Sequence, residues 1–274
     1  MNDDMPELGL EFFDTYFAFA PAALALRECV RLAAIREIDL PAPILDVGCG
    51  DGIFARLAYP DRQVWGIDIN ATEIRRAQAT ATYATLICGS ITSTDLPKEY
   101  FRSVIANCSL EHVPDIRGAF RTIGQSLVPG GRFVLIVPSP RWTEQLPMPR
   151  TLESVGLPSL ASAYRSGLDR LFRHVHMYDG NGWTQLLRDA GFVVDRMDPI
   201  VSPAVTAAFD LLLYPSVAGY ALKSATGHWT LLPELRRRLG AIPRGVIRGV
   251  ARVFSRDATE DPGEYVIVAH RERT

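Results

Sequence analysis

Five continuous apolar runs, separated by helical stretches, decide what this chain can fold into. They lie at residues 44–48, 63–69, 84–90, 103–109 and 131–139. Such an alternation is typical of parallel strands that are covered on both faces and joined by right-handed crossovers. With two later strands, the sequence predicts an α/β fold built on a doubly wound, seven-stranded, mostly parallel sheet with helical insertions.

The remainder of the chain is organised around this core. Apolar positions in residues 21–38 repeat at steps of three and four, which predicts a helix with Arg27 and its charged neighbours mostly off the apolar stripe. After Pro140 the strand pattern fails for about forty residues. We expect an N-terminal helical cap (1–40), the α/β core (41–140), an insertion or lid (141–182), a core helix and strand (183–200), a helical, basic amphipathic insertion (201–262) and the last core strand (263–274).

Charge and cysteine content narrow the compartment and the partners. A formal net charge of -2 over 274 residues gives no reason to expect a nucleic-acid partner. The four cysteines lack CxxC spacing, which favours free thiols in a reducing environment. The first residues lack the basic segment and apolar core of a signal peptide. We therefore expect a cytoplasmic protein, and the oligomeric state stays open.

The stretch "LDVGCGDG" (45–52) joins the first strand to a helix, and its glycines let a ligand approach the backbone closely. A phosphate-binding P-loop requires Lys and then Ser or Thr after the last glycine, where this chain has Ile53 and Phe54. The dinucleotide fingerprint requires a glycine at the position of Ile53. Asp46 would repel a pyrophosphate and attract an ammonium or sulfonium group. The loop therefore favours a nucleoside with a positive centre.

Asp68 ends the second apolar run, twenty residues after Gly48. In folds of this kind an acidic side chain at that place accepts hydrogen bonds from both ribose hydroxyls. A helix N-cap is the structural alternative for Asp68. Its spacing from the glycine loop favours the ribose.

Together these motifs resemble the class I S-adenosylmethionine-dependent methyltransferases, and among them the small-molecule group. The resemblance covers residues 40–140 and, more loosely, 186–194. It implies a Rossmann-like methyltransferase fold, S-adenosyl-L-methionine as cofactor and S-adenosyl-L-homocysteine as product. Ser90 departs from the family, which commonly has an acid there. The implied cofactor-binding residues are Asp46, Gly48, Cys49 and Gly50 at the methionine part, Asp68 at the ribose, Ile69, Ser90 and Ile91 at the adenine, and Asn107 at the end of the fourth strand.

Three histidines are candidates for the chemistry. Methyl transfer to a hydroxyl requires in-line alignment and a base. His112 follows the fourth strand in the segment "LEHV", where the family's histidine often holds the loop and the cofactor instead. His174 and His176 alternate and would share one face of an extended segment, as bases, acceptor ligands or structural hydrogen-bonding groups. We expect no metal, because these two lack an obvious acidic third ligand.

The acceptor is less constrained than the cofactor. Asn107 is followed by Cys108 and Ser109 rather than by the two prolines that amine-directed members of the class carry. We therefore expect an enzyme that O-methylates a small hydrophobic, glycosidic or lipid-linked acceptor. The alternatives are a membrane-associated cofactor-binding or scaffold protein of the same fold without methyl transfer, and an enzyme of this fold with another reaction.

Residues 202–256 suggest a membrane surface. The apolar part, 202–222, is interrupted by Asp210 and Pro215 and is marginal for a membrane span. Residues 236–256 predict an amphipathic helix whose basic face carries Arg244, Arg248, Arg252 and Arg256. This helix either packs on the domain or lies at the inner face of the membrane. Sparse aromatic residues argue against nucleic-acid contact there.

Overall fold

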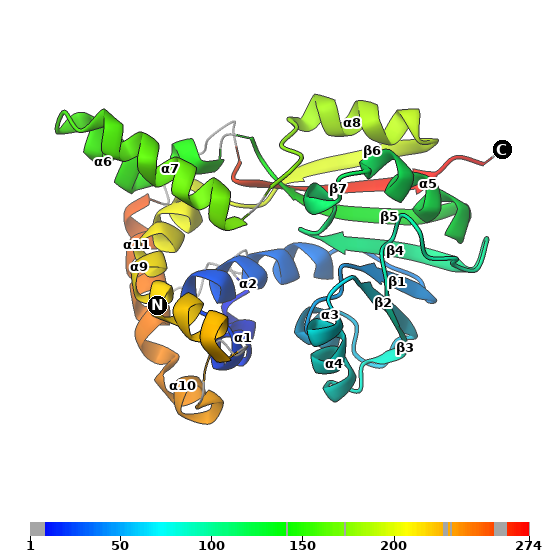
Figure 1. Cartoon of the computed structure of the whole chain (residues 1–274), viewed down its shortest axis with the longest axis horizontal. Helices are drawn as coiled ribbons and strands as arrows, with labels where there is room; N and C mark the ends of the chain where they lie inside the picture. Colours follow the sequence, from blue (N-terminus) through cyan, green and yellow to red (C-terminus); the bar gives the residue numbers. More distant parts are fainter. Residues whose placement is uncertain are drawn as a thin grey trace. The chain divides into compact units, whose positions relative to one another are not determined.

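The computed structural model describes residues 9–140, 142–172, 174–226, 230, 232–254 and 262–273. The chain forms two compact units (Figure 1). One unit comprises Met1–Ile35, Arg141–Phe172 and Ile200–Gly263 and is helical. The other comprises Arg36–Pro140, Arg173–Pro199 and Glu264–Thr274 and contains the sheet.

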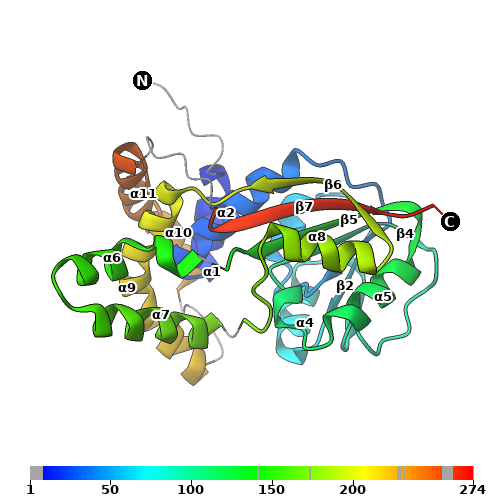
Figure 2. The ribbon, with the colours of Figure 1, turned by 90° about the horizontal axis from the view of Figure 1, so that it is seen from above.

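Seven strands form one sheet, in the order β3-β2-β1-β4-β5-β7-β6. β7 is antiparallel to both of its neighbours, and the pairs among β1 to β5 are parallel. Figure 2 shows β7, in red, between β5 and β6. The predicted seven-stranded, mostly parallel sheet is confirmed. The strands are β1 (Ile44–Val47), β2 (Val64–Asp68), β3 (Tyr83–Cys88), β4 (Phe101–Asn107), β5 (Leu127–Pro138), β6 (Phe192–Pro199) and β7 (Glu264–Arg271).

Helices cover this sheet on both faces. α3 (Ile53–Ala58) and α4 (Ala71–Ala79) connect the strands that lead outward from β1, whereas α5 (Ile116–Ser126) leads from β4 in the opposite direction. Right-handed crossovers in opposite directions put their helices on opposite faces. Figure 1 accordingly shows α3 and α4 beside β1 to β3, and α5 with α8 (Gly180–Asp189) beside β5 to β7. The sheet is doubly wound, as predicted.

A buried aromatic cluster packs between α5 and the part of the sheet that contains β5 and β6. Phe120 of α5 lies edge-on to Phe133 of β5, with ring centroids 5.9 Å apart, and Phe133 lies 5.2 Å from Phe192 of β6. Trp183 of α8 belongs to the same core. Such close packing holds the strands rigidly, so the loops at their carboxyl ends start from fixed positions.

The helical unit is assembled from segments that are far apart in the sequence. The guanidinium of Arg27 is buried 4.7 Å from the ring centroid of Phe209 and 5.5 Å from that of Trp142. These cation–π contacts join the N-terminal, middle and C-terminal parts of the unit. Its helices are η2 (Leu10–Phe12), α1 (Phe13–Phe19), α2 (Ala22–Arg36), η4 (Trp142–Gln145), α6 (Pro147–Ser154), α7 (Pro158–Phe172), α9 (Pro203–Thr226), α10 (Pro233–Leu239) and α11 (Ala241–Phe254).

The acid inside the apolar helix α9 has partners within this unit. Asp210 is buried, and its carboxylate accepts hydrogen bonds from the Tyr164 hydroxyl and, at 2.8 Å, from the Met148 N–H. In the part of the chain that the structure describes, no helix combines the length and the apolar character that crossing a membrane requires.

The arginines expected on the basic face of α11 differ in their surroundings. Arg244 forms an ion pair of 2.7 Å with Asp14 of α1, whereas Arg248 is exposed. The side chains of Arg252 and Arg256 lie outside the described residues. Part of this face therefore packs on the helical unit and part faces solvent.

Candidate functional site

A cavity of about 350 Å³ opens at the carboxyl ends of β1, β2 and β4. Strand order reverses between β1 and β4, and open α/β sheets bind their ligands at such a point. Six residues predicted from the sequence line this cavity: Gly48, Asp68, Ile69, Ser90, Ile91 and His112.

The glycine loop can approach this cavity only because Gly48 has no side chain. Its φ is +74°, in the left-handed region. A Cβ atom on Gly48 would lie 2.3 Å from the Cβ atom of Ser109, whose hydroxyl donates a 2.6 Å hydrogen bond to the Val47 carbonyl. The loop after β1 and the loop after β4 are therefore locked together, with bare backbone at the cavity wall. Gly50, also at positive φ, has open space where a side chain would project.

Asp68 connects the glycine loop to the start of α4. One carboxylate oxygen accepts a hydrogen bond of 3.0 Å from the Gly50 N–H, and the other accepts one of 2.7 Å from the Asn70 N–H. Asn70 is itself the N-cap of α4, so Asp68 does not have the N-cap role. A carboxylate oxygen has two lone pairs, so Asp68 retains acceptor capacity toward the cavity.

Asp46 lies in β1, directly before the glycine loop. Asp46 is only 2% exposed, and among the described residues it is not one that lines the cavity. Its carboxylate accepts a 2.7 Å hydrogen bond from the Tyr83 hydroxyl. Burial, and then the charge of Asp46, raise the pKa of Tyr83, which keeps the hydroxyl protonated as a donor. Asp46 is therefore a buried hydrogen-bond acceptor next to the glycine loop, and its role at the methionine part of the cofactor stays a prediction.

The residues predicted to contact the adenine are two isoleucines and a serine in a turn. Ile69 is 77% exposed, which is unusual for an isoleucine and leaves its side chain available to a flat ligand, whereas Ile91 is buried. The Ser90 hydroxyl forms a 2.8 Å hydrogen bond with the Thr92 hydroxyl, within its own turn. Ser90 therefore offers only part of its hydrogen-bonding capacity to a ligand.

The segment after β4 contributes more of the wall than the sequence predicted. Cys108, Ser109, Val113 and Pro114 line the cavity, whereas Asn107 does not line it within the described part of the chain. Cys108 has a φ of +45°, a strained conformation for a residue other than glycine. The signal available in the sequence was position alone, since these residues follow the strand end directly. Among the described residues, Cys49 and Gly50 are not part of the cavity lining.

His112 and His174 lie together at this wall. Their rings are stacked, with centroids 5.4 Å apart and planes 21° apart. The Glu111 carboxylate, 1% exposed, lies 3.8 Å from the His112 Nε2 atom. The Glu111 carbonyl accepts hydrogen bonds of 2.9 Å from the backbone N–H groups of Val175 and His176. The segment around His174 is thereby fixed to the loop after β4.

His176 has a positioning role. Its Nε2 atom donates a 2.9 Å hydrogen bond to the Val113 carbonyl, and its Nδ1 atom accepts one of 3.2 Å from the Tyr178 hydroxyl. Because both ring nitrogens are engaged, the tautomer is determined and neither nitrogen is available as a base. This geometry favours the structural alternative for His176.

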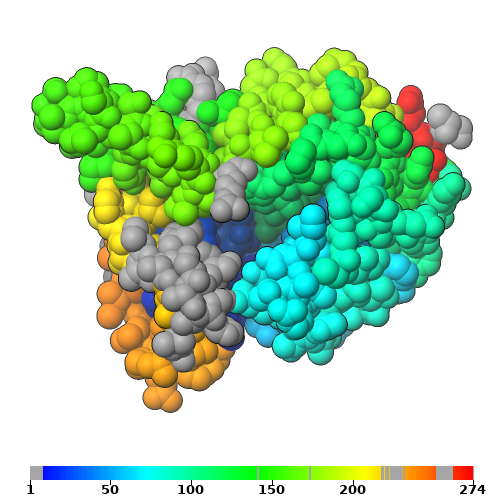
Figure 3. Space-filling model, in the orientation of Figure 1, coloured from blue at the N-terminus to red at the C-terminus, as the bar shows by residue number. Residues whose placement is uncertain are grey.

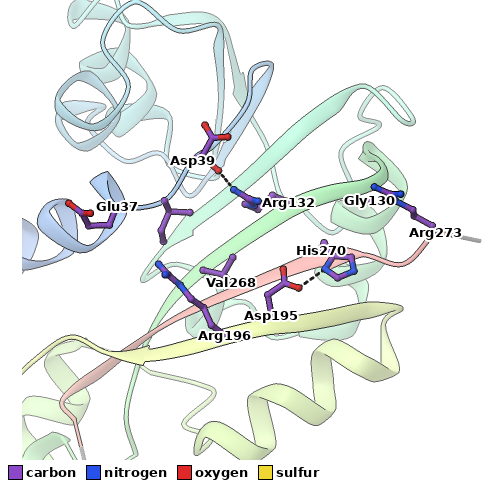
Figure 4. Close-up of a pocket in the computed structure, with 10 residues that line it drawn as sticks. Glu37, Asp39, Gly130, Arg132, Asp195, Arg196, Val268, His270 and Arg273 are labelled. Atoms are coloured by element: carbon purple, nitrogen blue, oxygen red, sulfur yellow. Dashed lines mark hydrogen bonds and ion pairs between the residues drawn. The ribbon is translucent and has the colours of Figure 1, made fainter.

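A second cavity, of about 530 Å³, lies on a sheet face over β5, β7 and β6 (Figure 4). Its wall is polar: Arg132 donates to the Asp39 carbonyl, and His270 Nδ1 lies 2.8 Å from Asp195 Oδ1. None of the residues predicted for the functional site lines it. The candidate site is therefore the cavity at the strand ends.

Comparison with known proteins supports the same assignment. The sequence profile of a family described as "Methyltransferase domain" matches residues 16–196, more than half of the chain. The chain belongs to the class I S-adenosylmethionine-dependent methyltransferases. The family and the Rossmann-like methyltransferase fold predicted from the sequence are confirmed, and S-adenosylmethionine is the cofactor of this family.

Curated relatives match over the cofactor-binding part. The uncharacterized methyltransferase Rv0089 of Mycobacterium tuberculosis is 38% identical over 96 residues, covering 34% of this chain and 49% of the relative. A ubiquinone biosynthesis O-methyltransferase of Alkalilimnicola ehrlichii is 31% identical over 99 residues, covering 33% and 39%. The sterol 24-C-methyltransferase erg6 of Aspergillus fumigatus is 34% identical over 98 residues, covering 33% and 26%. The chain thus spans about half, or less, of the length of these relatives.

Solved structures share the fold at low sequence identity. An S-adenosylmethionine-dependent methyltransferase from Mesorhizobium loti superposes with a TM-score of 0.51 at 18% identity, covering 87% of this chain and 96% of its own. The [4+2]-cyclase SpnF superposes with a TM-score of 0.56 at 16% identity, covering 98% and 94%. Phosphoethanolamine N-methyltransferase 2 of Haemonchus contortus, in complex with S-adenosyl-L-methionine, gives 0.54 at 14% identity, covering 98% and 59%.

Proposed function

We propose that this protein transfers the methyl group of S-adenosylmethionine to an oxygen atom of a small hydrophobic, glycosidic or lipid-linked acceptor by in-line displacement. The observation that carries the proposal is one cavity with the glycine loop and Asp68 on one wall and His112 on another. When bound, the cofactor supplies a methyl group activated by attachment to a sulfonium. The protein then has to align the acceptor and remove its proton.

The cofactor residues divide by chemistry. Gly48 gives the nucleoside close access to backbone, and Asp68 accepts hydrogen bonds from the ribose hydroxyls with its remaining lone pairs. Ile69 and Ile91 contact the adenine with apolar surface, beside the Ser90 turn. These residues fit the cofactor, because they combine a bare backbone, an acceptor pair and an apolar wall in one cavity.

Three neighbouring residues support the cofactor from outside the lining. Asp46 adds negative charge beneath the loop, which favours a cationic donor over a pyrophosphate. Cys49 and Gly50 contribute loop backbone, and the Gly50 N–H fixes the carboxylate of Asp68. The contribution of Asp46 is therefore electrostatic.

His112 assists the loss of the acceptor proton. As the acceptor oxygen forms its bond to the methyl carbon, the C–S bond breaks and its electron pair stays on sulfur. The hydroxyl proton passes to His112, whose ring stacks on the ring of His174 at the cavity wall. His176 supports this arrangement by holding the loop through the Val113 carbonyl.

A transfer assay tests the proposed function. The full chain is incubated with S-adenosylmethionine that carries an isotopically labelled methyl group, and with panels of phenolic, glycosidic and polyprenyl-linked alcohols. We expect label in an ether product of at least one panel, and loss of that product in His112→Ala. Label only on amine or carbon acceptors would overturn oxygen transfer.

A second candidate function is cofactor binding without methyl transfer. The similarity to SpnF favours it, since that protein is described as a [4+2]-cyclase and has the same fold. This alternative predicts that S-adenosylhomocysteine binds, while the labelled methyl group stays on the cofactor with every acceptor of the panels. Product from any acceptor excludes it.

For the helical unit we propose contact with an anionic membrane surface at the cytoplasmic side. Leu232, Leu235 and Leu239, at the N-cap and within α10, and Ile242, at the start of α11, are 45% to 67% exposed. Three arginines of the same two helices, Arg237, Arg238 and Arg248, are also exposed. Figure 3 shows α10 and α11, in orange, at the surface. Apolar burial and attraction to anionic headgroups would act together.

Co-sedimentation with vesicles tests the membrane contact. Wild type is expected to sediment with phosphatidylglycerol vesicles and to remain in solution with phosphatidylcholine vesicles. The double variant Leu235→Glu, Leu239→Glu is expected to lose binding. The matched control Leu157→Glu, Leu160→Glu changes two exposed leucines of the loop and helix after α6, and is expected to bind as wild type does. Equal sedimentation of both variants would overturn the proposal.

A further inference from the structure

We propose that Glu111, His112 and His174 bind a divalent transition-metal cation, of the Zn²⁺ or Mn²⁺ class, at the wall of the cofactor cavity. One ligand atom from each of the three residues lies within 4.8 Å of the other two. Metal bonds of about 2.0–2.2 Å set the ligand atoms of a tetrahedral site about 3.4 Å apart. Small side-chain rotations are therefore sufficient to close the three groups around an ion.

The backbone holds these ligands together without help from an ion. The Glu111 carbonyl accepts hydrogen bonds of 2.9 Å from the Val175 and His176 N–H groups. His174 directly precedes these two residues in the chain. His176 adds a second connection through the Val113 carbonyl. The loop after β4 and the segment before α8 thus form a preorganised pair, which reduces the entropy lost when a ligand binds.

The donor set indicates the class of ion. Two imidazoles and one carboxylate suit zinc, manganese, iron and cobalt, whereas magnesium and calcium prefer sites made entirely of oxygen. Three protein ligands leave at least one coordination position open, as in catalytic zinc sites. His112 lines the cavity, so the open position would face an acceptor. Glu111 is buried, and a cation beside it stabilises its charge.

The sequence predicts no metal, because no acidic third ligand is obvious beside His174 and His176. The acid comes instead from Glu111, which the fold brings to His174 from the end of β4. The structure thus supplies the third ligand whose absence was the argument against a metal.

An ion here would change how His112 assists methyl transfer. An acceptor hydroxyl bound at the open position would lose its proton at a lower pH, because the cation stabilises the alkoxide. His112 would then act through the ion instead of as a free base, and the acceptor proton would pass to solvent. This last step rests on the proposed O-methyl transfer, whereas ion binding does not.

Cobalt titration of the full chain tests the site. The protein is stripped with a chelator, exchanged into metal-free buffer and titrated with Co²⁺, while visible absorption and calorimetry are followed. We expect one equivalent to bind, with d–d bands of a four- or five-coordinate ion, and Zn²⁺ to displace it. His174→Ala and Glu111→Gln are expected to weaken Co²⁺ binding at least tenfold, and the control His270→Ala, whose histidine pairs with Asp195 elsewhere, to bind as wild type does.

Binding of S-adenosylhomocysteine to each variant separates the outcomes. His174 does not line the cavity within the described residues, so His174→Ala is expected to keep the nucleoside affinity and thereby to report folding. Absence of a one-equivalent Co²⁺ complex in wild type, or its retention in both ligand variants, overturns the metal site and leaves the transfer proposal standing. A bound ion without methyl transfer to any acceptor overturns the proposed function and leaves the metal site standing.

Discussion

Replacing Gly48 by alanine should damage both the fold and the cofactor site. The added Cβ atom would meet the Ser109 Cβ atom at 2.3 Å, where ordinary contact between carbon atoms is about 3.5–4.0 Å. The loops after β1 and β4 would have to separate, and the Ser109 hydrogen bond to the Val47 carbonyl would break. The φ of +74° adds strain for any residue with a Cβ atom.

These three effects set the expected magnitude. Left-handed backbone costs about 1–2 kcal/mol, overpacking about 1–3 kcal/mol and the lost hydrogen bond about 1 kcal/mol. We therefore expect Gly48→Ala to lower the free energy of unfolding by about 3–6 kcal/mol. S-Adenosylhomocysteine should bind about tenfold more weakly or worse, since about 1.4 kcal/mol of lost contact is sufficient for that.

Gly191 provides the matched control. It has a φ of +81°, and no atom of the described residues lies within 4 Å of the position that a Cβ atom would take. Gly191→Ala should therefore cost only the backbone strain of about 1–2 kcal/mol and leave the nucleoside affinity unchanged. Denaturant unfolding and calorimetry measure both quantities. Equal stability losses in the two variants, with unchanged affinity in Gly48→Ala, would contradict the importance of the close contact between Gly48 and Ser109.

Three further variants test the roles of Asp68, His112 and Asp210. Asp68→Asn should weaken S-adenosylhomocysteine binding about 10- to 100-fold in calorimetry, because charge-assisted hydrogen bonds are worth about 1.5–3 kcal/mol; equal affinity would contradict the ribose role. His112→Ala should lower the transfer rate at saturating S-adenosylmethionine about 10²- to 10⁴-fold; a full transfer rate would exclude His112. Burial raises the pKa of Asp210 above its unfolded value, so its contribution to stability is present at low pH and is lost as pH rises through the folded pKa. Asp210→Asn should remove that part of the pH dependence in denaturant unfolding, and an unchanged slope would contradict it.

The parts of the fold that sequence predicted are those that depend on local pattern. Apolar runs bounded by turns specify buried strands, and the positive φ at Gly48 favours glycine. Asp68 was recognisable because it follows a strand at a spacing set by one crossover. In each case neighbouring residues alone restrict the conformation.

The features that the sequence did not predict depend on contacts between distant segments. The sequence does not show that the carboxylate of Asp46 accepts a hydrogen bond from the Tyr83 hydroxyl of β3. The sequence predicts that Arg27 lies off the apolar stripe of its helix. In the structure its guanidinium packs against the rings of Trp142 and Phe209. Periodicity records which face of an element is apolar, and it does not record which segment covers that face.

The central claim is that the cavity at the ends of β1, β2 and β4 binds the cofactor. Calorimetry with S-adenosylhomocysteine tests it on wild type, on Asp68→Ala and on Arg196→Ala, which alters the second cavity. We expect one binding site in wild type, strongly weakened binding in Asp68→Ala and unchanged binding in Arg196→Ala. Binding that is absent from wild type, or that survives in Asp68→Ala and fails in Arg196→Ala, would contradict it.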